Sequence, residues 1–420
     1  MVKCLFCGRP ENEVKRLVTN EGAAICDRCI KATVQALGKA SEPEAEAPVE
    51  RALLRPKEIL AYLDQHVISQ TRAKTDVAVA VYNHYKRREA MQRGMIDDPE
   101  LAGVEIQKSN ILLLGPSGTG KTELARAISR MLGVPFYVAD ATKMTQAGYV
   151  GDDVESMLQG LIGDAGGDAE RAAWGIIFID EVDKLARKSG RNASGYRDVT
   201  GEGVQQALLK LVEGSKVRVP RSNAKVDLGQ GADVLDTTNV LFIAAGSFAG
   251  IEEVVTRRTN KGSRMGFGGA SVRKDMDLTE VYSSALEEDV LEFGLIPELL
   301  GRLPVLTTTL PLTEEEMVRI LVEPKNAIVK QFRALFAMDG IDLQLDEDAL
   351  KAIGREAKKR PTGARALRSI MEDLVRPFVL EHAGDDTVKA IRITAGVVSR
   401  EEQAIIVRAP AAPKPVQATA

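Results

Sequence analysis

The stretch that decides the fold is Gly115-Pro116-Ser117-Gly118-Thr119-Gly120-Lys121-Thr122, which matches the phosphate-loop pattern G-x-x-x-x-G-K-[ST]. An apolar run at residues 110–114 precedes it and favours a buried strand, and apolar residues recur at helical spacing over residues 121–132. Glycines let backbone N–H groups approach phosphates, and the helix N-terminus adds partial positive charge. We therefore predict an ATP site in which Lys121 contacts the β- and γ-phosphates and Thr122 binds Mg²⁺. A glycine-rich turn without function is the less favoured alternative.

A second half of this site is predicted at residues 176–181, where an apolar strand ends in Asp180 and Glu181. Asp180 is placed to hold Mg²⁺, directly or through water. Glu181 can orient and deprotonate the attacking water as a general base. A strand followed by a solvated helix cap is the alternative, and pairing with the phosphate loop makes it less favoured. We also predict that Glu123, which directly follows the loop, contacts the nucleotide.

Apolar strands alternate with helices around the loop, a pattern typical of a parallel sheet in an α/β domain. Strands are predicted at residues 135–138, 176–179 and 240–244, and helices at 59–63, 73–85, 154–162 and 204–212.

A smaller α+β domain is predicted from Thr313 onward. Thr313 and Glu316 form a capping box, and Asp346 is placed to cap a later helix. Strands are predicted at 341–345 and 388–394, with a helix at 364–374. We therefore expect an α/β protein divided into a zinc-binding module at 1–37, a flexible linker at 38–55, a large ATPase domain at 56–312, a small domain at 313–400 and a disordered tail at 401–420.

The four cysteines, Cys4, Cys7, Cys26 and Cys29, form two C-x2-C pairs at a spacing typical of a zinc site. Four thiolates complete a tetrahedral shell and leave no position for water, so the predicted role is structural. The metal would supply folding free energy that so few residues cannot supply alone. Redox thiols or a chance pattern are the alternatives. A small tethered zinc module is expected to dimerise or to recruit partners such as adaptor proteins.

Composition excludes several classes of protein. Lys and Arg total 56 and Asp and Glu total 60, a net charge of −4, which excludes a globally basic nucleic-acid binder. Aromatic residues make up 4%, which argues against base-stacking surfaces. Apolar runs fall short of the ~18 residues of a membrane span, and residues 1–9 lack the apolar stretch of a signal peptide. We expect a cytoplasmic protein without a membrane partner.

The phosphate loop, the two carboxylates, the small domain and the zinc module together resemble the ClpX family of AAA+ ATPases. Gly148-Tyr149-Val150-Gly151 and the segments at 294–298 and 301–304 strengthen the resemblance, which extends from Cys4 to about Arg400. It implies a homo-hexamer with ATP, Mg²⁺ and Zn²⁺ that unfolds and translocates protein substrates, delivers them to the ClpP peptidase and has chaperone activity by itself. No G-x-S-x-G or HExxH motif is present, so no peptidase activity of its own is expected.

The resemblance also implies roles for residues of the nucleotide site. Arg302 matches the arginine finger, which stabilises developing charge at a neighbouring subunit's ATP, and a surface ion pair is the alternative for this residue. Arg365 matches the second sensor, carried by the small domain. Val67 and Ile68 match the segment that packs on adenine, where Ser69 replaces an expected glycine.

Further matches concern protein partners. Tyr149 and Val150 match the loop that lines a central pore, although without the resemblance the sequence would favour a buried tyrosine in a turn. A second pore element is expected at residues 196–201. Met265-Gly266-Phe267 matches the tripeptide that docks into ClpP. Ser247 is the expected first sensor. The pore entrance, at about residues 219–235, offers Arg221 and Lys225 in place of the family's Arg-Lys-His.

Two other functions remain as alternatives. An AAA+ nucleic-acid remodeller with a zinc finger would require basic, DNA-facing loops, and the near-neutral charge argues against it. A non-catalytic zinc adaptor that merely binds ATP would not need Lys121, Asp180, Glu181 and Arg302 together. The rate of ATP hydrolysis with unfolded protein, with DNA and with ClpP separates the three.

Overall fold

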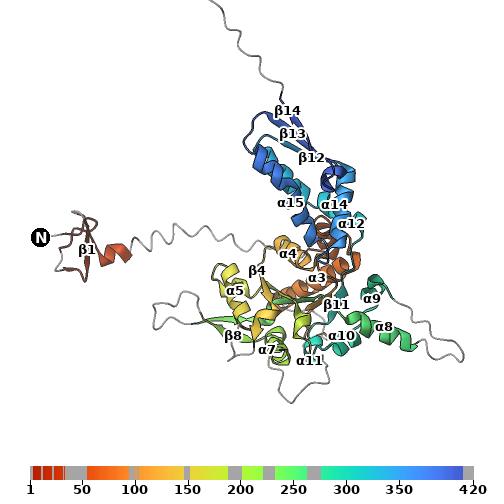
Figure 1. Cartoon of the computed structure of the whole chain (residues 1–420). Helices are drawn as coiled ribbons and strands as arrows, with labels where there is room; N and C mark the ends of the chain where they lie inside the picture. The colour runs from red at the N-terminus through yellow and green to blue at the C-terminus, as the bar shows by residue number, and fades with distance from the viewer. Residues whose placement is uncertain are drawn as a thin grey trace, which may run out of the picture. The chain divides into compact units, whose positions relative to one another are not determined.

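The computed structural model of the protein describes residues 3–10, 13–20, 23–31, 33, 54–93, 100–101, 104–145, 152–187, 201–220, 232–262 and 276–409. The chain forms two compact units, Met1–Leu54 and Arg55–Ala420 (Figure 1). Among the described helices, none is both long and apolar enough to cross a bilayer.

The N-terminal unit is built around a β-hairpin. Strands β1 (Leu17–Asn20) and β2 (Ala23–Cys26) are antiparallel, with Leu17 opposite Cys26. Cys4 and Cys26 are its buried cysteines. The hairpin therefore supplies one cysteine of the predicted zinc site from the end of a strand.

A five-stranded sheet forms the centre of the second unit, in the order β11-β3-β10-β7-β4. All neighbouring strands are parallel. Their bounds are β3 (Ile111–Leu114), β4 (Phe136–Asp140), β7 (Ile176–Asp180), β10 (Leu241–Gly246) and β11 (Val305–Thr308). This confirms the predicted parallel sheet, and it adds β11, which the sequence analysis did not identify.

Helices cover the sheet and bury a common core. Helix α4 (Lys121–Leu132) follows β3 with the predicted bounds. The core includes Leu112, Phe242 and Leu158. The other elements of this region are α2 (Pro56–Asp64), α3 (Thr71–Arg93), η2 (Ala141–Lys143), β5 (Met144–Thr145), β6 (Asp152–Asp153), α5 (Ser156–Asp164), α6 (Ala169–Ala172), η3 (Val182–Leu185), α7 (Glu202–Glu213), β8 (Lys216–Val219), β9 (Asp233–Asp236), η4 (Thr237–Asn239), α8 (Ile251–Gly262), α9 (Leu278–Ser284), α10 (Glu287–Phe293) and α11 (Pro297–Leu300).

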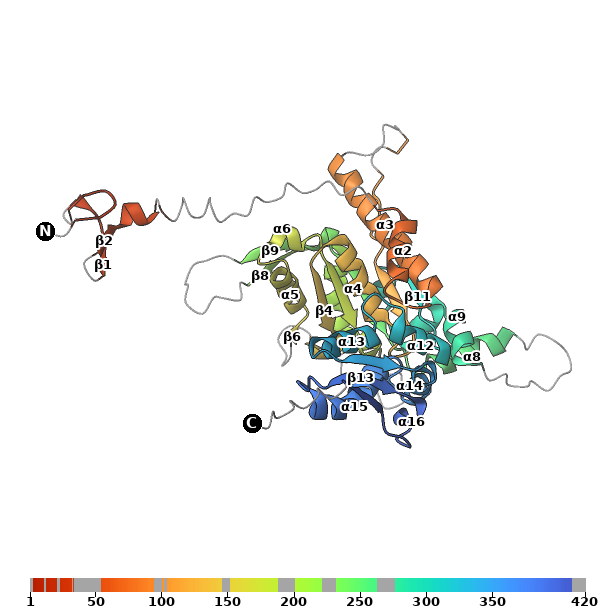
Figure 2. The same cartoon turned by 90° about the horizontal axis from the view of Figure 1, so that it is seen from above.

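The C-terminal elements form the predicted smaller α+β domain, here also called the C-terminal layer, around a hydrophobic core of their own. Figure 2 shows them gathered around β13. A three-stranded sheet has the order β12-β13-β14, with β12 parallel and β14 antiparallel to β13. The elements are α12 (Glu314–Val322), α13 (Ile328–Met338), β12 (Asp342–Leu345), α14 (Glu347–Lys359), α15 (Arg365–His382), β13 (Val388–Ile393), α16 (Ala395–Val398) and β14 (Ile405–Arg408).

Local predictions for this layer have mixed outcomes. The capping box is confirmed, since Glu316 N–H donates to Thr313 Oγ1 at 3.2 Å and Thr313 N–H to Glu316 Oε2 at 2.8 Å. Asp346 precedes α14 but does not cap it, because its carboxylate accepts two hydrogen bonds from Arg392 Nε, at 2.8 and 3.1 Å. The prediction of a disordered tail at 401–420 is wrong for residues 405–408. These residues form β14, whose backbone groups are hydrogen-bonded to β13.

Candidate functional site

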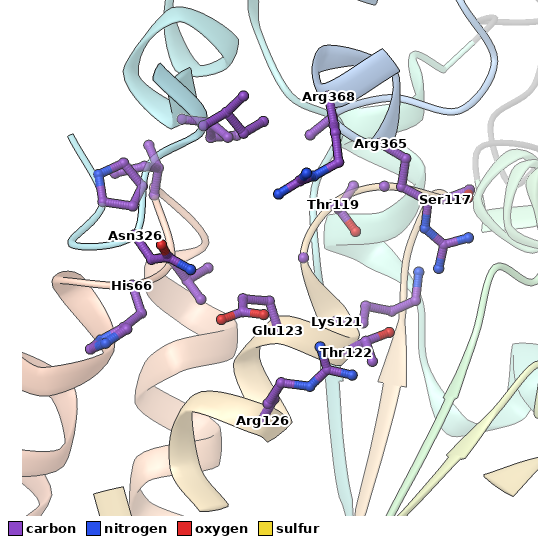
Figure 3. Close-up of a pocket in the computed structure, with 18 of the residues that line it drawn as sticks. His66, Ser117, Thr119, Lys121, Thr122, Glu123, Arg126, Asn326, Arg365 and Arg368 are labelled. Atoms are coloured by element: carbon purple, nitrogen blue, oxygen red, sulfur yellow. The ribbon is translucent and has the colours of Figure 1, made fainter. Parts of the chain in front are cut away.

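A cavity of about 810 Å³ lies at the carboxyl ends of the central strands, where parallel sheets with crossover helices commonly bind ligands. The large-domain elements and the C-terminal layer both contribute to its wall (Figure 3). Its lining contains the predicted residues Val67, Ile68, Ser117, Gly118, Thr119, Gly120, Lys121, Thr122, Glu123, Asp180, Glu181, Ser247 and Arg365. The structure thus brings most of the predicted nucleotide site into one cavity.

Lys121 is buried against the phosphate loop to which it belongs. Its Nζ donates to Gly115 O at 2.6 Å and to Pro116 O at 2.9 Å. Burial lowers the pKa of Lys121 to about 8, while the carboxylates of Asp180 and Asp183 act in the opposite direction. A bound phosphate would compete with the two carbonyl oxygens for this ammonium group.

The two carboxylates at the end of β7 both line the cavity. Glu181 has a φ of 58°, a left-handed conformation that costs energy in a residue with a side chain. Its N–H donates to Asp180 Oδ1 at 3.0 Å. The turn leaves both carboxylates at the cavity, together with Thr122 at the start of α4. Thr122 and Asp180 supply the hard oxygen donors that suit Mg²⁺, and Glu181 supplies a base.

Ser247 lies directly beyond the end of β10 and lines the cavity, as expected for a first sensor. Its N–H and its hydroxyl both donate to the carboxylate of Asp183, each at 3.1 Å. The sequence analysis did not identify Asp183, because nothing in the sequence distinguishes a carboxylate in η3 from an ordinary polar turn residue.

The apolar end of the cavity contains Val67 and Ile68, each 6% exposed. Ser69 and Gln70, which follow, have φ values of 56° and 55°, the conformation for which a glycine would be favoured. The Gln70 amide donates to Leu310 O at 2.9 Å and accepts from Leu310 N–H at 2.8 Å, which holds this backbone in place. The C-terminal layer adds the apolar side chains Ile320, Pro324, Ala327 and Ile328.

Cationic side chains line the cavity in larger number than the sequence analysis identified. Arg365 and Arg368 come from the first turn of α15, and Figure 3 shows the Arg365 side chain extending toward Lys121. Arg126 and Arg130 on α4 also line it. These two follow Thr122 at intervals of four residues, so helical spacing could have revealed them. His66, Lys184, Asn326 and Gln331 were missed as well, and their positions depend on tertiary packing.

The phosphate loop touches the C-terminal layer through two glycines. A Cβ on Gly118 would lie 2.2 Å from Thr362 O, and a Cβ on Gly363 would lie 2.8 Å from Ser117 O. Both glycines have positive φ, 77° and 56°. Side chains here would therefore separate the loop from the start of α15.

Arg302 lies at the other end of the sheet. It precedes β11, whose first residue is in register with Ile111, whereas the phosphate loop follows Leu114. Asn110 Nδ2 donates to Arg302 O at 3.0 Å, and the Arg302 guanidinium pairs with Glu213 Oε1, with Nη2 at 2.8 Å. Arg302 is not one of the described residues that line the cavity.

The four cysteines of the N-terminal unit converge. Their sulfur atoms all lie within 4.8 Å of one another. Zn–S bonds of ~2.3 Å in a tetrahedron place sulfurs ~3.8 Å apart, and Cys7 Sγ lies 3.6 Å from Cys26 Sγ. Cys26 N–H donates to Cys4 Sγ at 3.3 Å, which would stabilise a thiolate ligand. Four converging thiols fit Zn²⁺.

Several predicted residues lie outside the described residues. They are the loop residues Tyr149 and Val150, residues 196–200 of the second pore element, the pore-entrance residues Arg221 and Lys225, and the tripeptide Met265, Gly266 and Phe267.

Comparison with known proteins gives three family matches along the chain. Residues 2–38 match the ClpX C4-type zinc finger, residues 106–306 the AAA domain (Cdc48 subfamily), and residues 312–394 the C-terminal D2-small domain of ClpB protein. The ATP-dependent Clp protease ATP-binding subunit ClpX of Treponema denticola is 47% identical over 383 residues, which cover 90% of this chain and 89% of the relative. The chain belongs to the ClpX family. Membership confirms the predicted fold class and an ATPase with ATP, Mg²⁺ and Zn²⁺ as cofactors, and it favours the ClpX reading over the nucleic-acid remodeller.

Proposed function

We propose that the protein is an ATP-driven unfoldase and translocase that delivers protein substrates to the ClpP peptidase and acts as a chaperone by itself. The observation that carries the proposal is the single cavity shared by the phosphate loop, Asp180, Glu181 and Arg365, in a chain that also has the family's zinc finger. Because two layers meet at this cavity, a change of nucleotide can change the angle between them.

Within the cavity, Lys121 binds the β- and γ-phosphates and Thr122 and Asp180 hold Mg²⁺. Glu181 orients and deprotonates the attacking water. The apolar segment Val67–Ile68 packs on adenine. Residues 115–120 and Glu123 complete the nucleotide contacts, and Arg365 links them to the small domain.

Arg302 completes the ATP site of a neighbouring subunit. Its separation from the cavity of its own chain supports this role, since the four residues of β3, at about 3.3 Å each, lie between the level of Arg302 and the phosphate loop. A finger that acts on a neighbour requires a closed ring, and a homo-hexamer is proposed.

Substrate handling is assigned to loops of the same ring. Tyr149 and Val150 grip an extended polypeptide in the pore, with residues 196–201 as a second element. Met265, Gly266 and Phe267 dock on ClpP. The zinc module at 1–37 recruits adaptors through the linker at 38–55, and the large and small ATPase domains span residues 56–312 and 313–400.

The test of the function is ATP-dependent loss of a folded fluorescent substrate on addition of ClpP. We expect loss with ATP and ClpP together, and ATP hydrolysis without degradation in the Tyr149→Ala variant. Glu181→Gln should bind ATP and fail to hydrolyse it. Stimulation of ATP hydrolysis by DNA, without any effect of unfolded protein, would refute the proposal in favour of a nucleic-acid remodeller.

The contribution of Arg302 to a neighbour is tested by mixing two inactive variants. Lys121→Ala chains lack a working pocket but offer Arg302, and Arg302→Ala chains offer the pocket but no finger. Mixed assemblies should recover part of the ATPase activity, because some interfaces combine both intact residues. Mixed assemblies as inactive as each variant alone would contradict a role in trans.

A further inference from the structure

Ser247 occupies a central place among the strands that form the nucleotide cavity. Strand β10, which ends just before it, lies between β3 and β7. Gly246 is in register with Leu114, the last residue before the phosphate loop, and Ala244 is in register with Ile179, next to Asp180. Ser247 is therefore placed between the groups proposed to bind phosphate and the groups proposed to activate water.

One side of Ser247 is held by the carboxylate of Asp183. Asp183 Oδ1 accepts the Ser247 N–H and Oδ2 accepts the hydroxyl, each at 3.1 Å. Asp183 is 5% exposed, and Lys184 Nζ lies 3.4 Å from its Oδ2. A Cβ on Gly246 would lie 2.6 Å from Asp183 Oδ1, so the glycine permits this close approach.

The other side of Ser247 is held by Tyr282 of α9. The Tyr282 hydroxyl donates to Ser247 O at 2.8 Å, and the residue is 2% exposed. Burial raises the pKa of the Tyr282 phenol above its usual range, so it remains a donor at every pH at which the protein would be assayed. Asp183 and Tyr282 together engage the N–H, the hydroxyl proton and the carbonyl oxygen of Ser247.

These contacts determine what Ser247 can offer to a ligand. A carboxylate has no proton to donate, so the hydroxyl proton of Ser247 is directed to Asp183. The remaining capacity of Ser247 Oγ is to accept a hydrogen bond. A phosphate oxygen also only accepts, whereas a water molecule can donate. Ser247 Oγ in this arrangement therefore suits the attacking water better than the γ-phosphate.

We propose that Asp183 and Tyr282 are positioning residues that orient Ser247 Oγ to accept a hydrogen bond from one O–H of the attacking water, and this proton stays with the product phosphate. Glu181 takes the proton of the other O–H as the water oxygen bonds to the γ-phosphorus and the bond from that phosphorus to the β-phosphate oxygen breaks. The inference rests on the proposed ATPase function and deepens it by assigning two tasks to different residues of one cavity. The phosphate loop binds the nucleotide, whereas Asp183 and Tyr282, here called the clamp, align the water through Ser247. Loss of the clamp should lower kcat and leave nucleotide binding unchanged.

The test uses Tyr282→Phe in the full-length assembled protein, because this variant removes one hydroxyl and keeps the buried ring. We expect kcat for ATP to fall roughly two- to tenfold, the range set by one hydrogen bond, with KM and the Kd for ADP unchanged. Tyr85→Phe is the matched control, since Tyr85 OH donates to a backbone oxygen, that of Trp174, at 3.3 Å outside the cavity. It should leave kcat and KM unchanged.

A second measurement couples Asp183 to Ser247. In Asp183→Asn the amide can donate to Ser247 Oγ and reverse its hydroxyl, so kcat should fall on the order of tenfold with KM unchanged. In a Ser247→Ala background the same substitution should cost less, because the acceptor is already absent. The same fold loss in both backgrounds would overturn the inference.

Wild-type kcat in Tyr282→Phe would also overturn it, as would an equal loss in Tyr85→Phe. A rise in KM at constant kcat would show that the clamp serves binding instead of water alignment. These results concern the clamp alone. Failure of the wild-type protein to hydrolyse ATP would be the separate result that removes the proposed function.

Discussion

The buried ammonium of Lys121 predicts a pH dependence of nucleotide binding that can be worked out from the structure. Burial lowers the pKa of Lys121 to about 8 in the protein without nucleotide. Bound phosphates would favour the charged form, so binding must restore a proton wherever the free protein has lost it. The nucleotide affinity should therefore be nearly constant below about pH 7 and decrease as the pH rises through 8.

The size of the effect follows from the titration curve. With a pKa of about 8, Lys121 is roughly 90% charged at pH 7 and roughly 10% charged at pH 9, which weakens binding about tenfold, or about 1.4 kcal/mol. An ordinary lysine, with a pKa of about 10.4, would change the affinity only slightly over this interval.

Calorimetric titration with ADP between pH 7 and pH 9 measures both quantities. Repeating it in buffers of different ionisation enthalpy gives the proton uptake, which should approach one proton per nucleotide at pH 9. Lys121→Met is the control, and its weak residual binding should lack this proton uptake. Equal ADP affinity of the wild-type protein at pH 7.5 and pH 9 would refute the reasoning.

Three further perturbations test other parts of the structure. Gly363→Ala adds a Cβ 2.8 Å from Ser117 O at a positive φ, which costs about 1–2 kcal/mol in backbone conformation alone, so the KM for ATP should rise in steady-state assays. Cys26→Ser should release zinc, measured with a colorimetric indicator, and unfold the N-terminal unit while ATPase activity stays within about twofold. Phe242→Ala removes a fully buried ring from the core and should lower the free energy of unfolding by about 3–5 kcal/mol in urea titrations. Full activity of Gly363→Ala, retained zinc in Cys26→Ser or an unchanged urea midpoint in Phe242→Ala would contradict the respective argument.

The parts of the fold that sequence could predict are those with strong local signals. Helix α4 has its predicted bounds because the glycine-rich loop before it and Gly133 after it mark both ends. Strand β11 was not predicted, because Val305–Thr308 contains two threonines and follows a proline. The segment therefore shows neither an apolar run nor an alternation of apolar and polar residues. Strand β14 was not predicted, because it lies next to an Ala/Pro-rich segment and because its pairing with β13 depends on tertiary structure.

The same distinction holds for the site. A contiguous motif identified the phosphate loop, and the strand ending in Asp180 and Glu181 identified the carboxylates. Arg368 and Asn326 could not be found in this way, because the C-terminal domain brings them to the cavity from separate segments. Asp183 could not be found either, because a turn brings it to Ser247 from a distant part of the sequence. Tyr282 was hidden for the same reason, since its partner lies 35 residues earlier in the chain.

The placement of Arg302 at the far end of the sheet from the cavity has a genetic consequence on the proposed function. A chain with an altered Arg302 would keep an intact pocket and pass the defect to the subunit beside it. When altered and normal chains are made together, each altered chain would lower ATP hydrolysis in a neighbouring subunit whose own sequence is normal. Alleles that change Arg302 should therefore behave as dominant, whereas alleles that simply prevent the chain from folding should be recessive.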